Sequence, residues 1–526
     1  MPDGFWPAVL PAWLGGLALS FVLEALLLRP RPAPPWRRPV AALAVHAGVW
    51  TAVFALELAL FRRPLFAAAN VLAIEAVLAL VNHAKYRALR EPFVYPDFAY
   101  FADALRHPRL YLPFLGAGPV LAAAAGYGLA LWAGLALEPP VAAAARAPLA
   151  GSEAGALLAP ARLLGAAAAA ALAGLALAAA AGRRLPACGA DAVSDLRRLG
   201  LAASLWGCAR AERAPVPDAL REAGPFAGAA MPAGAPPAAL PDLVVVQSES
   251  FFDIRRYTPL VRPDVLARFD ALRERGALWG SLKVGAWGAN TVRTEFAFLA
   301  GLPESALGAH RYNPYRRLAR QGVPTLASYL RTLGYRTVCV HPYDGRFYRR
   351  DRVLPALGFD EFIDIAGFGA AARAGAYVGD RAVAERVADM LGGGGRQPLY
   401  VHVITMENHG PLHWERVAPE DAGQVLAAAM PSGCEELVAY ARHLRNADAM
   451  LERLAGALAG SPRPGGLCLF GDHVPIMDKV YRRLGPPGGD TDYLVWSTQA
   501  PSGGQRQDLD VHELAPAFLG WMGLMA

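Results

Sequence analysis

Five long apolar stretches in the first 182 residues constrain the fold of this chain more than any other feature of its sequence. They cover residues 5–28, 40–61, 65–81, 111–137 and 163–181. Each is close to the roughly 20 residues that an α-helix needs to cross a bilayer. The first has no basic residues before it and is too long for the apolar region of a cleavable signal peptide. We therefore predict a bundle of about five transmembrane helices over residues 1–182, in which the alanine-rich last stretch is the weakest span.

The charge distribution divides the chain into two parts. Residues 1–182 contain 13 Lys and Arg and nine Asp and Glu, and residues 183–526 contain the other 38 and 36. The net charge of +6 is spread without a basic run, so no nucleic-acid partner is expected. The five cysteines form no CxxC pair, which argues against a zinc ribbon or a dense disulfide framework and leaves one or two bridges at most.

Two features of the membrane half have more than one interpretation. Glu24, Glu57 and Glu75 lie inside or near the spans, where a carboxylate is either functional or a packing group of the bundle, and we favour packing. Residues 83–113 alternate aromatic side chains with five Lys and Arg. That composition suits a segment at the lipid headgroups, and a plain polar loop is the alternative.

The second half has the pattern of an α/β domain. Residues 183–240 are predicted to be a connector, because 214–241 is rich in Pro, Ala and Gly and has no periodicity. From residue 241 to residue 526, short β-rich runs alternate with amphipathic helical stretches. This alternation predicts a mainly parallel sheet with helices on both faces.

Ionisable side chains follow four of the predicted strands at the point where each strand ends. These strands are 243–246, 337–340, 399–404 and 467–470, and they lead to Glu249, His341, His409 and the pair Asp472 and His473. In open α/β sheets, ligands bind beyond the carboxyl ends of the strands. Carboxylates and imidazoles gathered at one edge would form a site for a divalent cation.

Thr291 follows a turn of small residues and begins an apolar helical run. At the start of a helix, free backbone N–H groups and the positive end of the dipole stabilise an anion. A hydroxyl placed there beside a metal can act as a nucleophile toward phosphorus or sulfur. The alternative is that Thr291 is only the N-cap of the helix.

Together these motifs resemble those of the lipoteichoic acid synthase family, a branch of the alkaline phosphatase/sulfatase superfamily. The resemblance implies an N-terminal bundle of about five spans followed by an α/β catalytic domain of the alkaline phosphatase/sulfatase type. Two departures concern the acceptor: Tyr348 stands where lipoteichoic acid synthase has tryptophan, and residues 474–477 after the GDH motif also differ.

The resemblance also implies roles for individual residues. Glu249 in SESFF, Asp472 and His473 in FGDH, and Thr291 in NTVRTEF look like the family's metal ligands, and Thr291 also matches its nucleophile. His409 in ENHGP resembles the substrate-binding histidine and is a candidate acid or base. The segment HPYDGRFYRRD resembles one that contacts the phosphoglycerol head group, with the candidate substrate-binding residues His341, Tyr348 and Arg350. The implied cofactor is Mn²⁺, with Mg²⁺ or Zn²⁺ as alternatives.

The expected function is transfer of glycerol phosphate from phosphatidylglycerol to a glycan or polyglycerolphosphate acceptor through a threonine intermediate. Alternatives are phosphoethanolamine transfer, hydrolysis of sulfate or phosphate esters, and a non-enzymatic role in membrane assembly. The sulfatase route is disfavoured, because none of the five cysteines lies in a CxPxR-type context.

The side of the membrane is predicted differently by two arguments. With five spans, the loops on one side carry nine Lys and Arg against four on the other, which favours a cytoplasmic catalytic domain. The resemblance and the location of glycan acceptors favour a periplasmic or extracellular one. We expect the second arrangement, in a multi-pass protein of the cell (inner) membrane.

Overall fold

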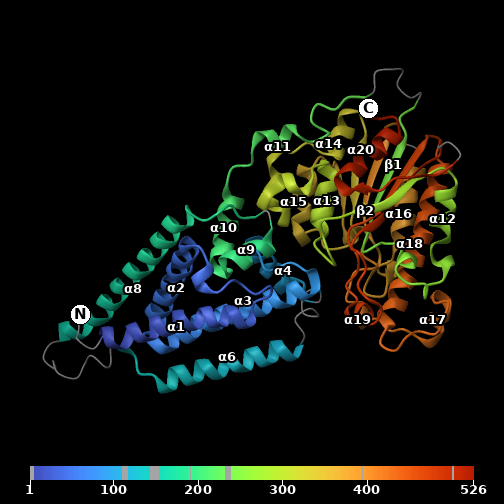
Figure 1. The fold of residues 1–526 in the computed structure, drawn as a ribbon. Helices are drawn as coiled ribbons and strands as arrows, with labels where there is room; N and C mark the ends of the chain where they lie inside the picture. Colours follow the sequence, from blue (N-terminus) through green and yellow to red (C-terminus); the bar gives the residue numbers. More distant parts are fainter. Residues whose placement is uncertain are drawn as a thin grey trace. The chain divides into compact units, whose positions relative to one another are not determined.

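The computed structural model describes residues 5–108, 110, 117–141, 153–189, 191–231, 239–393, 395–499 and 503–525. The chain forms two compact units, Met1–Ala214 and Pro215–Ala526 (Figure 1). The boundary between the units lies inside the predicted connector.

The first unit is helical. Its helices are α1 (Phe5–Leu27), α2 (Val40–Phe61), α3 (Pro64–Leu89), α4 (Tyr100–Arg106), α6 (Ala117–Leu137), α8 (Glu153–Gly182), α9 (Ala192–Leu199) and α10 (Leu201–Arg213). Four stretches are long and apolar enough to cross a membrane: Val9–Leu27, Val40–Phe61, Pro64–Leu89 and Ala161–Gly182. Helix α6 contributes a shorter apolar stretch, Ala124–Leu137. Four of the five predicted spans thus have matching helices. The span predicted at 111–137 stays a prediction, and its residues 111–116 lie outside the described residues.

The alanine-rich helix α8 packs closely on α2. A Cβ atom added at Gly174 would lie 2.6 Å from the carbonyl oxygen of Gly48 and 2.9 Å from the amide nitrogen of Ala52. A Cβ added at Gly48 would lie 2.5 Å from the oxygen of Gly174. The two backbones therefore approach each other directly, which small residues allow in membrane helix pairs. This contact holds the alanine-rich helix in the bundle.

A buried ion pair connects α1 with the start of α2. Glu24 is fully buried and accepts a hydrogen bond from Arg38 Nη1 at 2.5 Å. Its other oxygen accepts from the backbone N–H of Leu201, the first residue of α10, at 2.8 Å. Asn70 Nδ2 donates to Glu57 at 2.6 Å. Glu24 and Glu57 thus have partners within the bundle, as a packing role requires.

The segment after α3 is folded rather than a plain polar loop. It contains the 3₁₀ turn η2 (Tyr95–Ala99) and α4, with the rings of Phe93 and Phe98 5.0 Å apart and those of Phe98 and Phe101 5.8 Å apart. Phe98 and Phe101 are about 40% exposed (40% and 39%). Lys85 pairs with Glu91 and Asp97, at 2.6 Å each. This arrangement suits the predicted position at the lipid headgroups.

The second unit contains one large sheet and a small hairpin. The strands are β1 (Asp242–Ser248), β2 (Leu278–Lys283), β3 (Arg336–Val340), β4 (Glu361–Ile363), β7 (Leu399–Ile404), β8 (Gly465–Gly471), β9 (Thr491–Ser497), β10 (Gln505–Arg506) and β11 (Leu509–Asp510), with β5 (Arg373–Ala374) and β6 (Tyr377–Val378) in the hairpin. The order is β10-β2-β9-β8-β1-β7-β3-β4, and β11 also pairs with β2. Among the described strands of this sheet, β9 alone runs against the others. The predicted fold class, with a mainly parallel sheet, is confirmed.

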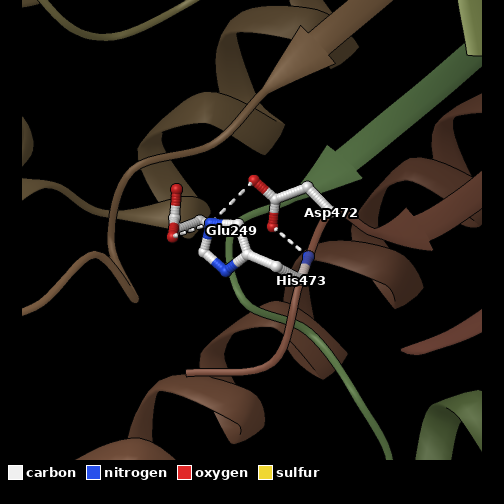
Figure 2. A group of neighbouring side chains, drawn as sticks. All are labelled: Glu249, Asp472 and His473. Atoms are coloured by element: carbon white, nitrogen blue, oxygen red, sulfur yellow. Dashed lines mark hydrogen bonds and ion pairs between the residues drawn. The ribbon is translucent and has the colours of Figure 1, made fainter. Parts of the chain in front are cut away.

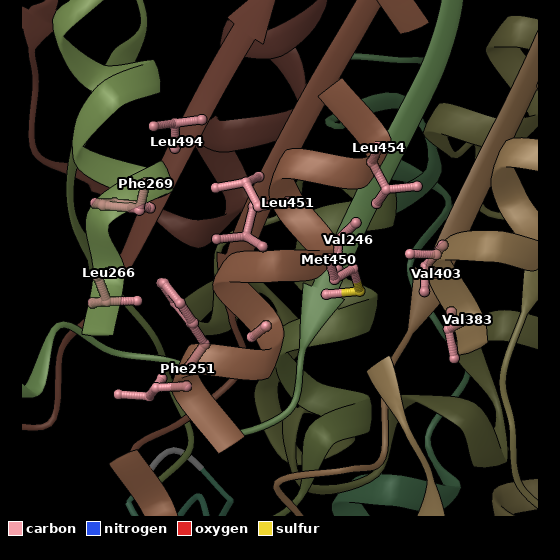
Figure 3. Close-up of a cluster of buried hydrophobic side chains, with 14 of the residues drawn as sticks. Val246, Phe251, Leu266, Phe269, Val383, Val403, Met450, Leu451, Leu454 and Leu494 are labelled. Atoms are coloured by element: carbon pink, nitrogen blue, oxygen red, sulfur yellow. The ribbon is translucent and has the colours of Figure 1, made fainter. Parts of the chain in front are cut away.

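Helices cover both faces of the sheet (Figure 1). They are α11 (Asp218–Glu222), α12 (Ala267–Glu274), α13 (Thr291–Ala300), α14 (Leu326–Thr332), α15 (Arg350–Ala356), α16 (Asp380–Gly392), α17 (Pro419–Val425), α18 (Glu435–Ala459), α19 (Asp478–Leu484) and α20 (Val511–Trp521). Strand β1 explains the layering, because successive side chains of a strand point to opposite faces. Val244 and Val246 belong to one buried cluster with residues of α12, α16 and α18, and Figure 3 shows part of it, including Val246 and Met450 of α18. Leu243 and Val245 pack with α13, α14, α15 and α20.

Part of the predicted connector belongs to the folded core of the second unit. Leu220 in α11 and Phe226 are buried, and the ring of Phe226 stacks on Tyr329 at 6.2 Å. All five cysteines are free, so none of the one or two bridges that the sequence allowed is formed.

We predict that Gly174→Ala weakens the first unit, because the added methyl group must displace the backbone of α2. Overpacking of this kind costs about 1–3 kcal/mol. The free energy of unfolding should fall by about that amount in detergent-solubilised full-length protein. Gly165→Ala in the same helix is the control, since its Cβ meets nothing within 4 Å. Equal stability of the two variants would contradict the close contact between α2 and α8.

Candidate metal centre

The pairing of two central strands brings together three of the predicted metal ligands. Strands β1 and β8 are parallel neighbours, with Ser248 opposite Gly471 at their ends. The next residues, Glu249 and Asp472, therefore leave the sheet side by side. His473 follows Asp472 directly, so the register of one strand pair assembles all three side chains.

Glu249, Asp472 and His473 form a compact buried cluster. Their ligand atoms lie within 4.8 Å of one another, and all three residues are buried. His473 Nε2 is 3.6 Å from Glu249 Oε1 and 3.4 Å from Asp472 Oδ2. Figure 2 shows the imidazole facing both carboxylates.

Ser250, the residue after Glu249, holds the cluster together. Its hydroxyl donates to Glu249 Oε1 at 2.8 Å, and its backbone N–H donates to Asp472 Oδ1 at 2.9 Å. The backbone N–H of His473 also donates to Asp472 Oδ1, at 2.9 Å. Asp472 Oδ2 has no hydrogen-bond partner in the part of the chain that the structure describes.

The cluster fits a divalent cation. Burial, reinforced by the neighbouring carboxylate of Asp472, raises the pKa of Glu249 to about 8. Two buried carboxylates this close are costly when both are charged, and a bound cation offsets that cost. Asp472 Oδ2, which accepts no hydrogen bond in the described part of the chain, is available as a ligand atom. Two carboxylates and an imidazole are ligands that Mn²⁺ and Zn²⁺ accept.

Helix α13 begins against this cluster. Thr294 donates its hydroxyl to the backbone oxygen of Asp472 at 2.7 Å. Thr291 is the first residue of the helix, three positions earlier, and therefore lies on the same face as Thr294. Asn290 occupies the N-cap position with a φ of 68°, so the N-cap interpretation of Thr291 is wrong.

His341 and Arg350 form a second buried group. Arg350 Nη2 donates to Glu295 Oε2 at 2.8 Å, and both side chains are almost fully buried, with exposed fractions of 1% and 0%. His341 Nδ1 lies 3.1 Å from the backbone oxygen of Ile404, which makes it the donor, so Nε2 accepts from Arg350 Nη1 at 3.2 Å. Burial and the charge of Arg350 hold the pKa of His341 well below its ordinary value.

Tyr348 lies against Arg350, whose guanidinium carbon is 5.2 Å from the ring centroid. The backbone of Tyr348 is left-handed, with a φ of 55°, which is uncommon for a residue other than glycine. The neighbouring ring of Phe347 is 4.2 Å away. The structure therefore brings Tyr348, Arg350 and His341 together, as the sequence motif suggested.

His409 follows β7 and is half-buried. Its Nδ1 donates to the backbone oxygen of Gly410 at 2.8 Å, which leaves Nε2 without the ring proton in the neutral form. Burial lowers the pKa of His409, while the charge of Asp472 opposes and that of Arg350 reinforces this effect. The imidazole is thus within electrostatic reach of both groups of predicted site residues.

Several residues of the site were not singled out from the sequence. Ser250 and Glu295 stand inside the quoted motifs SESFF and NTVRTEF, so adjacency to the selected residues was the available signal. Thr405 also belongs here, since its hydroxyl accepts the backbone N–H of Glu249 at 2.9 Å. Tyr377 has no such signal, because it lies in the short hairpin and reaches His409 only through the fold.

Comparisons with known proteins agree with this architecture. Residues 241–524 match the Sulfatase family model, which is more than half of the chain. The capsular polysaccharide biosynthesis protein RkpI of Rhizobium meliloti (strain 1021) is 32% identical over 257 residues, which are 48% of this chain and 45% of the relative. A putative cyclic β-1,2-glucan modification protein of the same organism is 27% identical over 311 residues, which are 55% of this chain and 46% of the relative. The chain thus matches less than half of the length of these curated relatives.

One solved structure covers nearly the whole chain. The integral membrane protein lipooligosaccharide phosphoethanolamine transferase A of Neisseria meningitidis is 13% identical, with a TM-score of 0.54. The similarity covers 97% of this chain and 95% of that chain. At this level of identity the comparison shows a shared fold.

We predict that cation binding weakens as the pH falls below about 8. In the metal-free protein Glu249 then carries a proton, because its pKa is raised to about 8, and the cation must displace it. One displaced proton gives an affinity loss of about tenfold per pH unit, and this loss should disappear above that pKa. Calorimetric titration with Mn²⁺ between about pH 6 and about pH 9 measures it.

Variants of the cluster supply the controls for this titration. Asp472→Asn and His473→Ala should each lose bound metal in elemental analysis, while Asp264→Asn, at an exposed position, should keep it. Undiminished metal content in Asp472→Asn, or an affinity that does not change with pH, would contradict the assignment.

Proposed function

The chain belongs to the sulfatase family, and on that basis we propose that it is a membrane-anchored, metal-dependent phosphoglycerol transferase. The donor would be phosphatidylglycerol, and the acceptor a glycan or a growing polyglycerolphosphate chain. The observation that carries the proposal is the position of α13. Its first turn, which begins with Thr291, contacts the strand end that supplies Asp472 and His473.

The cluster would hold the metal through Glu249, Asp472 and His473, with Thr291 as a fourth ligand. A divalent cation bound there, which we propose to be Mn²⁺ with Mg²⁺ or Zn²⁺ as alternatives, would supply positive charge that lowers the pKa of a nearby hydroxyl and polarises a phosphodiester. The N-terminus of α13 adds the positive end of its dipole and free N–H groups at the same place.

The reaction would take place in two steps. The hydroxyl oxygen of Thr291 bonds to phosphorus as the bond to the diacylglycerol oxygen breaks, and the threonine proton passes to that leaving oxygen. An acceptor hydroxyl then bonds to phosphorus, the bond to Thr291 breaks, and the acceptor proton returns to the threonine. The neutral imidazole of His409, with Nε2 as the lone-pair nitrogen, is suited to carry the proton in each step.

The buried group around Arg350 is suited to the phosphoglycerol head group. Two nitrogens of the guanidinium are held by Glu295 and His341, and Nε has no hydrogen-bond partner in the described part of the chain. Arg350 would place positive charge at the phosphate, and His341 and Tyr348 would border the glycerol. A tyrosine there in place of tryptophan adds a hydroxyl that can hydrogen-bond to substrate.

The names of two curated relatives support a glycan acceptor, because one is called a capsular polysaccharide biosynthesis protein and the other a putative cyclic β-1,2-glucan modification protein. Phosphoethanolamine transfer is the second candidate, because the full-length fold match is a phosphoethanolamine transferase.

We also propose that the catalytic unit lies on the periplasmic or extracellular side of the cell (inner) membrane. The count of spans decides what the loop charges imply. With the four stretches found in the structure, the basic loops at 29–38 and 83–113 lie opposite the second unit, and the positive-inside rule favours export of that unit. With α6 as a fifth span, the same rule favours the cytoplasm.

We predict that Thr291→Ala abolishes release of diacylglycerol from phosphatidylglycerol vesicles while the circular dichroism spectrum is unchanged. Loss of the nucleophile removes the chemistry, whereas one small buried hydroxyl contributes only about 1 kcal/mol to folding. In the wild type without acceptor, mass spectrometry of the peptide with Thr291 should detect bound phosphoglycerol. Thr332→Ala, at the end of α14, is the matched control.

Two outcomes would contradict parts of this proposal. Diacylglycerol release by Thr291→Ala at the wild-type rate excludes the threonine mechanism. Release from phosphatidylethanolamine vesicles but not from phosphatidylglycerol vesicles replaces the proposed donor with the second candidate.

We predict that alkaline phosphatase fused after Ala526 is active, because it requires the oxidising exterior to fold. Green fluorescent protein fused at the same place and exported by the general secretion route should be dark. The opposite pair of results would place the second unit in the cytoplasm, away from the proposed acceptors.

A further inference from the structure

Glu407 and His409 are two residues apart in the loop after β7, but their side chains have different surroundings. Glu407 is buried, with an exposed fraction of 1%. It accepts hydrogen bonds from the backbone N–H of Asp380 at 2.7 Å, from His443 Nδ1 at 2.9 Å and from Asn446 Nδ2. These donors belong to the start of α16 and to α18, so Glu407 fastens the loop to two helices.

His443 joins the two ends of this loop. Its Nδ1 faces Glu407, and its Nε2 lies 2.9 Å from both carboxylate oxygens of Glu415. Burial by itself lowers the pKa of His443, but the hydrogen bonds to Glu407 and Glu415 outweigh it and raise the pKa to about 9. Both ring nitrogens therefore donate near neutral pH. The residues that His443 joins stand on either side of His409 in the sequence.

A second positively charged side chain, Arg442, fixes the end of the loop at Glu415. Arg442 donates to Glu415 at 2.7 Å and to Asp421 at 3.1 Å, and Asp421 lies in α17. The chain of charges thus runs from Glu407 through His443 and Glu415 to Arg442.

Tyr377 reaches His409 from another direction. Its hydroxyl lies 3.4 Å from His409 Nδ1 and 3.2 Å from the backbone oxygen of Gly410. Tyr377 stands three residues before Asp380, whose N–H binds Glu407. Contacts therefore hold the loop both before His409, at Glu407, and after it, at Gly410.

Burying the charged groups of this network costs free energy, and a gain in protein stability does not explain why they are buried. Removing carboxylates and an imidazole from water costs several kcal/mol per ion, and apolar side chains of similar volume often stabilise a core as well or better. What directed hydrogen bonds add is a single position for the backbone that they hold. Here the backbone that they hold carries His409.

We propose that Glu407 is a positioning residue that sets the place of His409 in the phosphotransfer site, and that His443 orients Glu407 by binding Glu415 at the same time. The proposal rests on the function proposed above, because it assigns its effect to the imidazole that carries the proton. It assigns no contact with substrate to Glu407 or His443.

The test is a double-mutant cycle between Glu407 and His409 in the full-length, metal-loaded protein, with diacylglycerol release as the readout. Glu407→Gln and His443→Gln should each lower kcat by about 10- to 100-fold, as loss of an orienting partner does, with KM for the lipid and metal content unchanged. In a His409→Ala background, Glu407→Gln should have no further effect, since the group that it positions is gone. A role in folding alone would lower activity by the same factor in both backgrounds, and that result overturns the proposal.

A second measurement does not depend on activity. Hydrogen exchange followed by mass spectrometry should show faster exchange at residues 405–415 in Glu407→Gln and His443→Gln, with β1 and β8 unchanged. Arg453→Gln is the matched control, because it breaks an exposed ion pair between the same helix α18 and Glu385, at 2.9 Å. Unchanged exchange at 405–415 overturns the proposal, whichever lipid serves as donor. Activity on phosphatidylethanolamine alone would overturn the phosphoglycerol assignment, and the same cycle is then measured on that lipid.

Discussion

Two carboxylates buried side by side, Glu249 and Asp472, are the constraint around which the second unit is arranged. The parallel register of β1 and β8 leaves them no freedom to separate. Nearby polar groups partly offset their charge: the Ser250 hydroxyl and N–H, and the backbone N–H and imidazole of His473. Each of these groups belongs to a residue adjacent to Glu249 or Asp472 in the sequence, so local chain geometry accounts for much of the cluster. Asp472 Oδ2 accepts no hydrogen bond in the described part of the chain, and a cation bound there would offset the charge that remains.

The fold and the ligand cluster could be predicted from the sequence because the relevant signals are local. Runs such as 243–246 and 467–470 are buried on both faces, and the residues that follow such runs in a parallel sheet must lie at one edge. The partners of those residues could not be predicted in the same way. Glu295 meets Arg350 across 55 residues, and Glu407 meets His443 across 36. Such contacts depend on how helices pack, which periodicity does not specify.

Where the prediction was wrong or incomplete, a neighbouring residue or a tertiary contact decided the outcome. Asn290 takes the N-cap position because it tolerates the left-handed backbone there, which removes that role from Thr291. Composition marked 214–241 as a linker, although Leu220 and Phe226 are apolar residues that the core of the second unit buries. Alanine content marked α8 as the weakest span, and this was wrong, because the mean hydropathy of Ala161–Gly182 is 2.1, equal to that of Pro64–Leu89 and above the 1.8 and 1.7 of the other two stretches. Its contact with α2 depends on the small size of Gly174, a property that hydropathy does not measure.

That contact has a consequence for the order in which the protein is made. An alanine-rich helix has small side chains and can pack closely on a partner that is already in the membrane, since helices in lipid associate through close packing. Helix α2 ends at residue 61 and α8 begins at residue 153, so α2 leaves the ribosome well before its partner. Helix α2 can therefore already be in the bilayer when the alanine-rich helix α8 is inserted. The order of these two helices in the sequence therefore affects how the protein is inserted into the membrane.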